Sequence, residues 1–183
     1  MASRYWLLSI SGTRPLLVHA ANSLGGTGGR TGTKPDPGEE AEAALHKDRD
    51  GNPIIPSINI LAAMKKAAVD FKVPGKGRRT YLNYILSGLD LAPVEIPLLS
   101  ASNGHIATWE VDLKPVVVQR ARIHRARPRF DDWALDFDLT VLDPIIAPDT
   151  ARTILESAGQ YNGLCDFRPL YGLFQVDLFD RVE

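Results

Sequence analysis

Residues 114–142 decide the fold, and they read Lys-Pro-Val-Val-Val-Gln-Arg-Ala-Arg-Ile-His-Arg-Ala-Arg-Pro-Arg-Phe-Asp-Asp-Trp-Ala-Leu-Asp-Phe-Asp-Leu-Thr-Val-Leu. From Trp133 to Val141 apolar and polar side chains alternate, which is typical of a strand with one buried face. Residues 116–118 are three valines, also typical of a strand, and residues 128–132 contain the proline and aspartates that favour a turn. We therefore predict one long antiparallel hairpin near the centre of a sheet, with its turn at residues 128–132.

The first arm of this hairpin is dense in cations and contains no acid between Asp112 and Asp131. In a strand its cations divide between two faces, which carry Arg120, Arg122 and His124 on one side and Arg125, Arg127 and Arg129 on the other. One possibility is that these side chains pair across the hairpin with the acids of the second arm, a solvated ladder that stabilises little: Asp131, Asp132, Asp136 and Asp138. The other is that they bind phosphate groups. We favour phosphate binding, because one row of acids neutralises only one of the two sets.

The segments around the hairpin complete an α+β pattern. A first strand or bent pair lies within residues 4–18, and a final strand lies within residues 173–179. Two amphipathic helices are predicted, one after Ser57 and one after Pro148, from apolar residues at helical spacing: Ile60, Met64, Ala67 and Phe71, then Ala151, Ile154, Leu155 and Ala158. The order strand, helix, strand, strand, helix, strand is that of a ferredoxin-like (RRM-like) βαββαβ fold.

We expect residues 1–183 to form a single domain with two interruptions. Residues 22–42 are rich in glycine and poor in apolar side chains, which predicts a flexible, mobile loop after the first strand. Residues 74–113 contain several prolines and mixed apolar segments, which predicts an insertion with short strands before the central hairpin.

Composition narrows the classes of protein. Hydrophobic residues make up 44% and charged residues 23% of the chain, as in ordinary globular domains. The formal net charge of −1 does not indicate a nucleic-acid binder, so the clustering of the basic residues matters more than their number. One cysteine excludes an intrachain disulfide and favours a reducing compartment. With no apolar run of membrane-spanning length and no signal peptide at the N-terminus, we expect a cytoplasmic protein without a membrane partner.

Motifs for metal, cofactor or covalent chemistry are weak. The four histidines are scattered without paired Cys/His spacing, so we predict no metal site and no cofactor. Cys165 has no histidine nearby in the sequence, and no Gly-x-Ser-x-Gly motif is present. Trp133 and Phe137 either stack bases or, as their alternation favours, belong to the core.

Further basic residues extend the set that could bind RNA. Four of them surround the first predicted helix and its end, where they either bind RNA or are simply solvated: Lys65, Lys66, Arg78 and Arg79. Arg168 lies between Gly163 and Gly172, where backbone amides can approach a phosphate closely. The alternative for Arg168 is a structural clasp on Asp166 or on a helix end.

Three segments together resemble the RAMP superfamily, the ferredoxin-like backbone subunits of CRISPR-associated effector complexes. Residues 46–57, His-Lys-Asp-Arg-Asp-Gly-Asn-Pro-Ile-Ile-Pro-Ser, precede an apolar helix as the segment RD-x-G-x-P-x-IPG-S does in that superfamily. Residues 163–174, Gly-Leu-Cys-Asp-Phe-Arg-Pro-Leu-Tyr-Gly-Leu-Phe, resemble its C-terminal glycine-rich loop. Residues 13–18, Thr-Arg-Pro-Leu-Leu-Val, are similar to its first strand before the mobile loop.

This resemblance implies an RNA-binding backbone subunit that coats a guide RNA or other single-stranded RNA along the sheet and the glycine-rich loop. It also implies copies stacked into a filament, with other effector-complex subunits as partners. Some members of the superfamily cut target RNA with an aspartate of the first mobile loop, which makes Asp36 a candidate for cleavage, although we expect a non-catalytic protein. Compact phage-encoded proteins share the pattern, so a phage structural or assembly protein that contacts only protein is the alternative.

Overall fold

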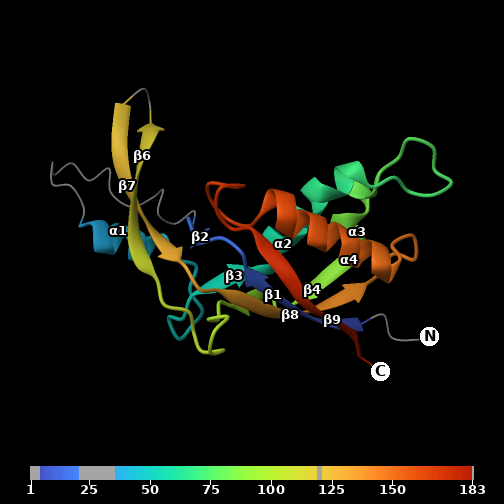
Figure 1. Cartoon of the computed structure of the whole chain (residues 1–183), viewed down its shortest axis with the longest axis horizontal. Coiled ribbons are helices and arrows are strands. Elements are labelled where there is room, and N and C mark those ends of the chain that lie inside the picture. The colour runs from blue at the N-terminus through green and yellow to red at the C-terminus, as the bar shows by residue number, and fades with distance from the viewer. Residues whose placement is uncertain (1–4, 21–35, 119–120, 183) are drawn as a thin grey trace.

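The computed structural model describes residues 5–20, 36–118 and 121–182, and a four-stranded antiparallel sheet lies at its centre (Figure 1). The strand order is β4-β8-β1-β9, formed by Leu89–Ala92, Ala134–Val141, Tyr5–Gly12 and Phe174–Arg181. Helices α2 (Ser57–Ala67) and α4 (Pro148–Ser157) cover one face of this sheet. The chain is therefore α+β, as the sequence predicts, and its arrangement is compatible with a ferredoxin-like fold.

The alternation in β8 places every second side chain under the helices. Leu135, Phe137 and Leu139 are buried and lie opposite Ile10, Leu8 and Trp6 of β1, which are buried as well. Burial of these apolar pairs on one face fixes the register, because a slip by one residue would turn all of them outward. Trp133 and Phe137 are 1% and 4% exposed, so both belong to the core and neither offers a ring for base stacking.

Both predicted helices are present, and most of the predicted apolar residues are buried, but α2 ends at Ala67, so Phe71 lies beyond it in extended backbone and is only partly buried. Ile60, Ala63 and Met64 of α2 are buried, as are Ile154 and Leu155 of α4. Pro148 occupies the first turn of α4, where its missing N–H is not needed, and Asp149 adds a negative charge at the positive end of the helix dipole. Short elements complete the helical layer: η2 (Ala68–Asp70), η3 (Tyr81–Asn83), α3 (Ile85–Gly88) and η4 (Ala158–Asn162).

The predicted central hairpin is wrong in its pairing. Residues 121–130 form β7 (Ala121–Phe130), which pairs with β6 (Glu110–Val118) and with β2 (Leu16–Leu17), and not with β8. β6 ends at Val118 and β7 begins at Ala121, and the Gln-Arg pair between them in the sequence contains no glycine, proline or asparagine to indicate a turn. The turn residues at 128–132 carry the chain from one sheet into the next. In Figure 1 the β6–β7 hairpin projects away from the four-stranded sheet.

The two segments predicted to interrupt the domain, residues 74–113 and 22–42, contain helices and strands. Residues 74–113 include β4, an edge of the main sheet, and β5 (Glu95–Pro97), which pairs with β3 (Ile54–Pro56). Of the predicted flexible loop 22–42, residues 22–35 lie outside the described residues, but residues 37–42 belong to helix α1 (Pro37–Ala43), contrary to the prediction. The physical reason is a strong helix start. Asp36 Oδ2 accepts hydrogen bonds from Gly38 N at 2.9 Å and Glu39 N at 3.3 Å, and Pro37 follows it.

The glycine-rich loop, residues 163–172, folds back on itself and onto the start of the chain. Leu164 N donates to Gly172 O at 2.8 Å, Gly172 N donates to Pro15 O at 2.8 Å, and Asp166 N donates to Leu17 O at 2.9 Å. Gly163 and Gly172 have φ values of +71° and +74°, which favour glycine. No helix of the described ranges is long and apolar enough to cross a membrane.

Replacing Gly172 should destabilise the fold strongly. An added Cβ would lie 2.1 Å from Leu164 O, and the residue would keep a positive φ. We expect Gly172→Ala to lower the free energy of unfolding by about 3 kcal/mol, measured by chemical denaturation. Gly104→Ala is the matched control, because its φ of +71° is similar but no atom lies within 4 Å of the added Cβ. It should cost about 1 kcal/mol, and equal losses for the two variants would contradict this account of the loop.

Candidate functional site

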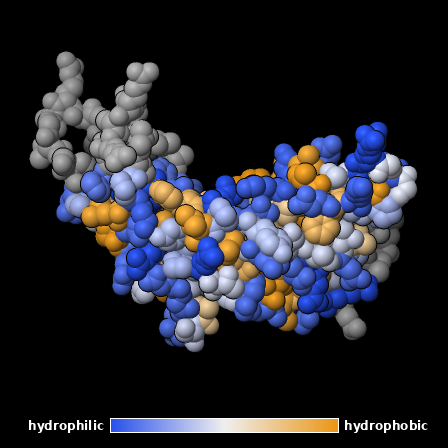
Figure 2. Space-filling view, turned by 45° about the horizontal axis from the view of Figure 1, so that its top comes forward, coloured by the Kyte–Doolittle hydropathy of each residue, from blue (hydrophilic) through white to orange (hydrophobic). Residues whose placement is uncertain are grey.

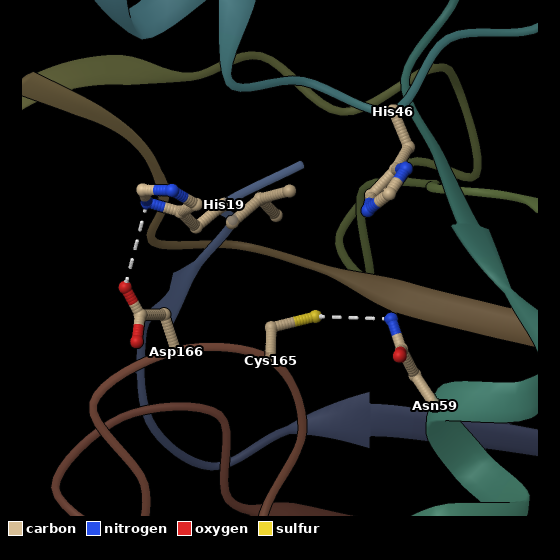
Figure 3. A pocket seen from close by; sticks show the side chains of 6 residues that line it. His19, His46, Asn59, Cys165 and Asp166 are labelled. Atoms are coloured by element: carbon tan, nitrogen blue, oxygen red, sulfur yellow. Dashed lines mark hydrogen bonds and ion pairs between the residues drawn. The ribbon is translucent and has the colours of Figure 1, made fainter. Parts of the chain in front are cut away.

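The three segments that resemble the RAMP superfamily meet around one cavity. It has a volume of about 260 Å³ and is lined by Val18, His19, His46, Asn59, Cys165 and Asp166 (Figure 3). Val18 ends the first of these segments, His46 begins the second, and Cys165 and Asp166 belong to the glycine-rich loop. Segments more than 100 residues apart in the sequence thus form a single site.

Backbone hydrogen bonds hold each wall of this cavity in place. Val18 N donates to Pro128 O of β7 at 3.2 Å, and Ala20 N donates to Ala44 O at 2.8 Å. Ile54 N donates to His46 O at 2.9 Å, which closes the loop that leads into β3. Asn59 lies in the first turn of α2, directly after β3, so the short strand aims its side chain at the cavity.

An ion pair between a buried arginine and a partly exposed aspartate supports the wall formed by the glycine-rich loop. Arg127 is 7% exposed, and its Nε lies 2.6 Å from Asp166 Oδ2. The contact is close but not aligned as a hydrogen bond, since neither Nε nor Nη1 of Arg127 hydrogen-bonds to any residue in the described ranges. The guanidinium also lies over the ring of Phe167, with 5.0 Å between its Cζ and the ring centroid. Asp166 Oδ1 accepts Phe167 N at 2.9 Å, so the carboxylate is held from two sides.

Both histidines of the cavity favour their neutral forms. Burial lowers the pKa of His19, and the charge of Arg127 lowers this pKa further, outweighing Asp166, whose Oδ2 lies 3.9 Å from His19 Nδ1. Burial alone lowers the pKa of His46. At neutral pH the cavity therefore presents two uncharged imidazole rings, each with one N–H donor and one nitrogen acceptor.

Cys165 is not poised for covalent chemistry. Burial raises the pKa of its thiol to about 12, so the thiolate that would act as a nucleophile is rare at neutral pH. Asn59 Nδ2 lies 3.9 Å from the sulfur and makes a weak hydrogen bond to it. The residue has a φ of +59°, an uncommon value for a side chain other than glycine, asparagine or aspartate.

One face of β7 is neutralised by acids of the chain itself. Arg125 Nη1 lies 2.9 Å from Glu40 Oε1, Arg127 pairs with Asp166, and Arg129 forms two hydrogen bonds of 2.8 and 2.9 Å with Asp131. Arg129 also approaches Asp112 at 3.4 Å and Glu110 at 3.3 Å. Except for Asp131, these acids are not the ones that the predicted hairpin would have brought near. For Arg125, Arg127 and Arg129, ion pairing within the chain is therefore the better description.

The other predicted binding residues are spread over the molecule. Arg120 and the side chain of Arg122 lie outside the described residues, whereas His124 is exposed on β7 and Arg168 is exposed in the glycine-rich loop. Asp166 pairs with Arg127, so the predicted clasp of Arg168 on Asp166 is not observed. Lys65 and Lys66 lie on α2, and Arg78 and Arg79 occupy an exposed loop at the far end from β6 and β7 (Figure 1). The surface is hollowed between these two ends (Figure 2).

The uncovered face of the four-stranded sheet is acidic. Asp90 of β4 and Asp136 and Asp138 of β8 point away from the helices, and Asp180 of β9 lies opposite Leu7 on the same face. Asp90, Asp136 and Asp138 are the only charged residues of β1, β4 and β8. Carboxylates repel phosphate, so this face is a poor surface for the RNA that the resemblance placed along the sheet.

The structure shows the surroundings of Asp36 and of the side chains that could bind a metal ion. The Asp36 carboxylate caps α1 through Gly38 N and Glu39 N. Within residues 5–20, 36–118 and 121–182, no group of three His, Cys, Asp or Glu side chains is arranged to hold a metal ion.

Sequence reasoning missed most of the cavity. The sequence motifs argue against His19 and His46 as metal ligands and against Cys165 as a nucleophile, and they assign no role to Asn59. The available signal was the set of segments that resemble one family, because segments that share a family pattern tend to meet at a common site. Tracing which polar residues occur within or beside all three segments would have found His19, His46, Asn59 and Asp166.

The cysteine provides a direct chemical test. With its pKa raised to about 12 by burial, Cys165 should react very slowly with Ellman's reagent at pH 8 in the folded protein. In concentrated guanidinium chloride the same thiol should react within seconds to minutes, like a free cysteine. Fast reaction of the folded protein would show that the thiol is accessible and ionised.

The lowered pKa of His46 makes stability depend on pH with a definite sign. Below pH about 6.5 the unfolded chain protonates this histidine more than the folded protein does, so the free energy of unfolding falls as the pH falls from 7 to 5. In His46→Gln this fall should be smaller, as measured by urea denaturation at each pH. His105→Gln, which removes a histidine from an exposed turn outside this cavity, is the matched control. A larger fall in His46→Gln than in the parent would reverse the assigned sign.

Comparison with known proteins assigns this chain to no family. No family model matches the sequence, and no curated protein matches it. Among solved structures, the chain is similar to Cmr6 from Pyrococcus furiosus, with a TM-score of 0.47 and 12% sequence identity, over 96% of this chain and 99% of that one. Similarity at this level assigns neither a family nor an activity, so a function has to be argued from the site.

Proposed function

We propose that this chain is a non-catalytic RNA-binding subunit of a CRISPR-type effector complex. The RNA would lie where the glycine-rich loop, β2 and the β6–β7 hairpin meet. The observation that supports this most is the meeting of three family-like segments around one cavity at the foot of the hairpin. We further propose that β1, α2, β4, β8, α4 and β9 are the six elements of a βαββαβ core, a proposal supported by the strand order β4-β8-β1-β9.

Exposed cations beside the glycine-rich loop supply the phosphate contacts in this proposal. Arg168 is exposed within the loop, and Arg14 is exposed next to it, with Nη1 lying 3.4 Å from Pro169 O and 3.5 Å from Leu170 O. Lys114 of β6 lies nearby over the ring of Tyr171 at 5.1 Å, but it is partly buried and its Nζ lies 3.4 Å from Asp112 Oδ1, so it is not counted among these exposed cations. A guanidinium that is not engaged by a carboxylate is free to bind a phosphate in a bidentate manner. In this proposal the RNA therefore contacts these residues beside the loop and not the open face of the sheet, whose carboxylates disfavour RNA.

A backbone subunit of an effector complex would also contact other protein chains. In the proposal, copies of the chain stack along a guide RNA as a filament and contact other effector-complex subunits. The alternative is a phage structural or assembly protein that contacts only protein. The observation that favours the alternative is the internal pairing of Arg125, Arg127 and Arg129, because paired arginines need no nucleic acid.

Binding of single-stranded RNA over a salt series tests the proposal. Each phosphate contact releases counterions, so log affinity should fall linearly with log salt concentration. Arg14→Ala combined with Arg168→Ala removes two exposed cations beside the loop. This double variant should bind about tenfold more weakly and lower the salt slope by about one unit. Its melting temperature should stay close to that of the parent, because both side chains are exposed.

The matched control is Arg78→Ala combined with Arg79→Ala, which removes the same charge from the exposed loop at the far end. It should keep the affinity and the salt slope of the parent. Equal losses in the two double variants would mean that RNA is held by diffuse charge rather than at the loop. Binding that ignores salt would rule out the proposal. An assembled oligomer that purifies without nucleic acid and binds no RNA would support the phage alternative.

A further inference from the structure

We infer that the open face of the four-stranded sheet is a docking surface for a second copy of this chain, which places its basic loop, residues 72–79, on that face. This inference rests on the stacking of copies that the proposed function contains, and it names the two surfaces that meet. RNA takes no part in the contact. Because the two surfaces differ, each copy that docks still has one of them free, so the assembly is open-ended.

The carboxylates of the open face have no cationic partner in the part of the chain that the structure describes. Within residues 5–20, 36–118 and 121–182, no lysine, arginine or histidine forms a salt bridge with these four residues: Asp90, Asp136, Asp138 and Asp180. Their cross-strand neighbours are uncharged, since Ser9 lies opposite Asp136 and Leu7 lies between Asp138 and Asp180. Like charges on one sheet face are unfavourable, so this face gains from cations supplied by another molecule.

The same face has a groove that suits long basic side chains. It has a volume of about 490 Å³, and Leu7, Leu178, Asp136 and Asp138 are among the residues that line it. Leu7 and Leu178 are 45% and 39% exposed, so both present apolar surface to a partner. Lysine and arginine side chains bury an apolar stem while the charged end stays at a polar group. The groove offers leucines for such stems and carboxylates for the charged ends.

The basic loop between η2 and η3 projects from the body of the chain. Val73 N donates to Arg79 O at 2.9 Å, and Val73 is buried, so the base of the loop is closed and anchored in the core. Gly75 and Gly77 have φ values of +71° and +65°, which turn the chain at the tip. In Figure 1 the loop extends beyond the helices. It is therefore shaped to enter a groove on another molecule.

The loop carries as many cations as the open face carries carboxylates. Its four cations are all exposed: Lys72, Lys76, Arg78 and Arg79. None of them forms a salt bridge with a residue of the described ranges. The loop follows α2 and η2 in the helical layer, on the other side of the sheet from the open face, so it does not reach the carboxylates of its own copy. The two sets of charges complement each other only between two copies.

Self-association of the purified protein without RNA is the first measurement. Sedimentation equilibrium at low salt should show a mean mass that rises steadily with protein concentration, because a head-to-tail contact does not close at a dimer. Added salt should weaken the association, since salt screens exposed charges. A protein that stays monomeric at every concentration at low salt would overturn the inference, even where the same protein binds RNA.

Charge reversal tests which surfaces meet. Arg78→Glu combined with Arg79→Glu changes the loop, and Asp136→Lys combined with Asp180→Lys changes the face. Each double variant should associate at least about tenfold more weakly, because loop and face then carry the same sign of charge. All four side chains are exposed, so both variants should keep the melting temperature of the parent.

The two double variants should rescue each other. In a mixture, the intact loop of one variant meets the intact face of the other, so association should return. All four changes in one chain should restore it as well, since a reversed loop then meets a reversed face. Failure of both rescues in folded proteins would overturn the assignment of the surfaces. If a reversal unfolds the protein, Arg78→Gln with Arg79→Gln and Asp136→Asn with Asp180→Asn should each still weaken association, and full association of either pair would overturn the inference.

The matched control for the loop variant is Arg14→Glu combined with Arg168→Glu, which makes the same change of net charge beside the glycine-rich loop. The control should associate like the parent and bind RNA more weakly. With an RNA short enough for one copy, the loop variant should show the reverse. Equal loss of association in the control would mean that net charge alone matters, which would overturn the inference. A parent that associates but binds no RNA would overturn the proposed RNA binding and leave the interface standing.

Discussion

The ion pair between the buried Arg127 and the partly exposed Asp166 is the interaction on which the functional end of this molecule depends. Transfer of the Arg127 guanidinium from water costs several kcal/mol. The nearby carboxylate offsets only part of this cost, because neither Nε nor Nη1 of Arg127 hydrogen-bonds within the described ranges. Here the pair joins β7 to the glycine-rich loop, and Phe167 covers the guanidinium. Because the loop backbone is also bonded to β2 at Leu17, the hairpin, the loop and the first strand region form one rigid corner. The shape of the cavity follows from this corner.

The elements that the sequence predicted well are those whose signal is local and periodic. The alternation from Leu135 to Val141 and the helical spacing of Ile60, Met64 and Ala67 each identify a buried face without any knowledge of the partner strand or helix. The α+β class follows from the order of such elements. The hairpin was mispredicted because the two residues between β6 and β7 are not of the types that favour turns, whereas Pro128 and Asp131 indicated a turn where the chain only changes sheets.

The candidate site was harder, because its chemistry depends on pairings between distant residues. Arg127 and Asp166 are 39 positions apart in the sequence, and Arg125 and Glu40 are 85 apart, so no local pattern shows which arginines are already neutralised. The acids predicted to face the arm, Asp136 and Asp138, instead line the open face of another sheet. The three segments that resemble the RAMP superfamily were informative because they did not depend on knowing such pairings. They indicated which parts of the chain lie together without requiring that any single contact be known.

The acidic sheet face has a consequence beyond excluding phosphate from it. The formal net charge is only −1, yet carboxylates gather on the open sheet while exposed guanidinium groups stand beside the glycine-rich loop at the end of β1. Such a separation gives the protein an electric dipole despite its near-neutral total. A dipole in the field of a polyanion experiences a torque, so in the proposed function the loop end would turn toward the RNA before the two touch. Correct orientation on approach then comes from long-range electrostatics, and salt would slow this alignment by screening it.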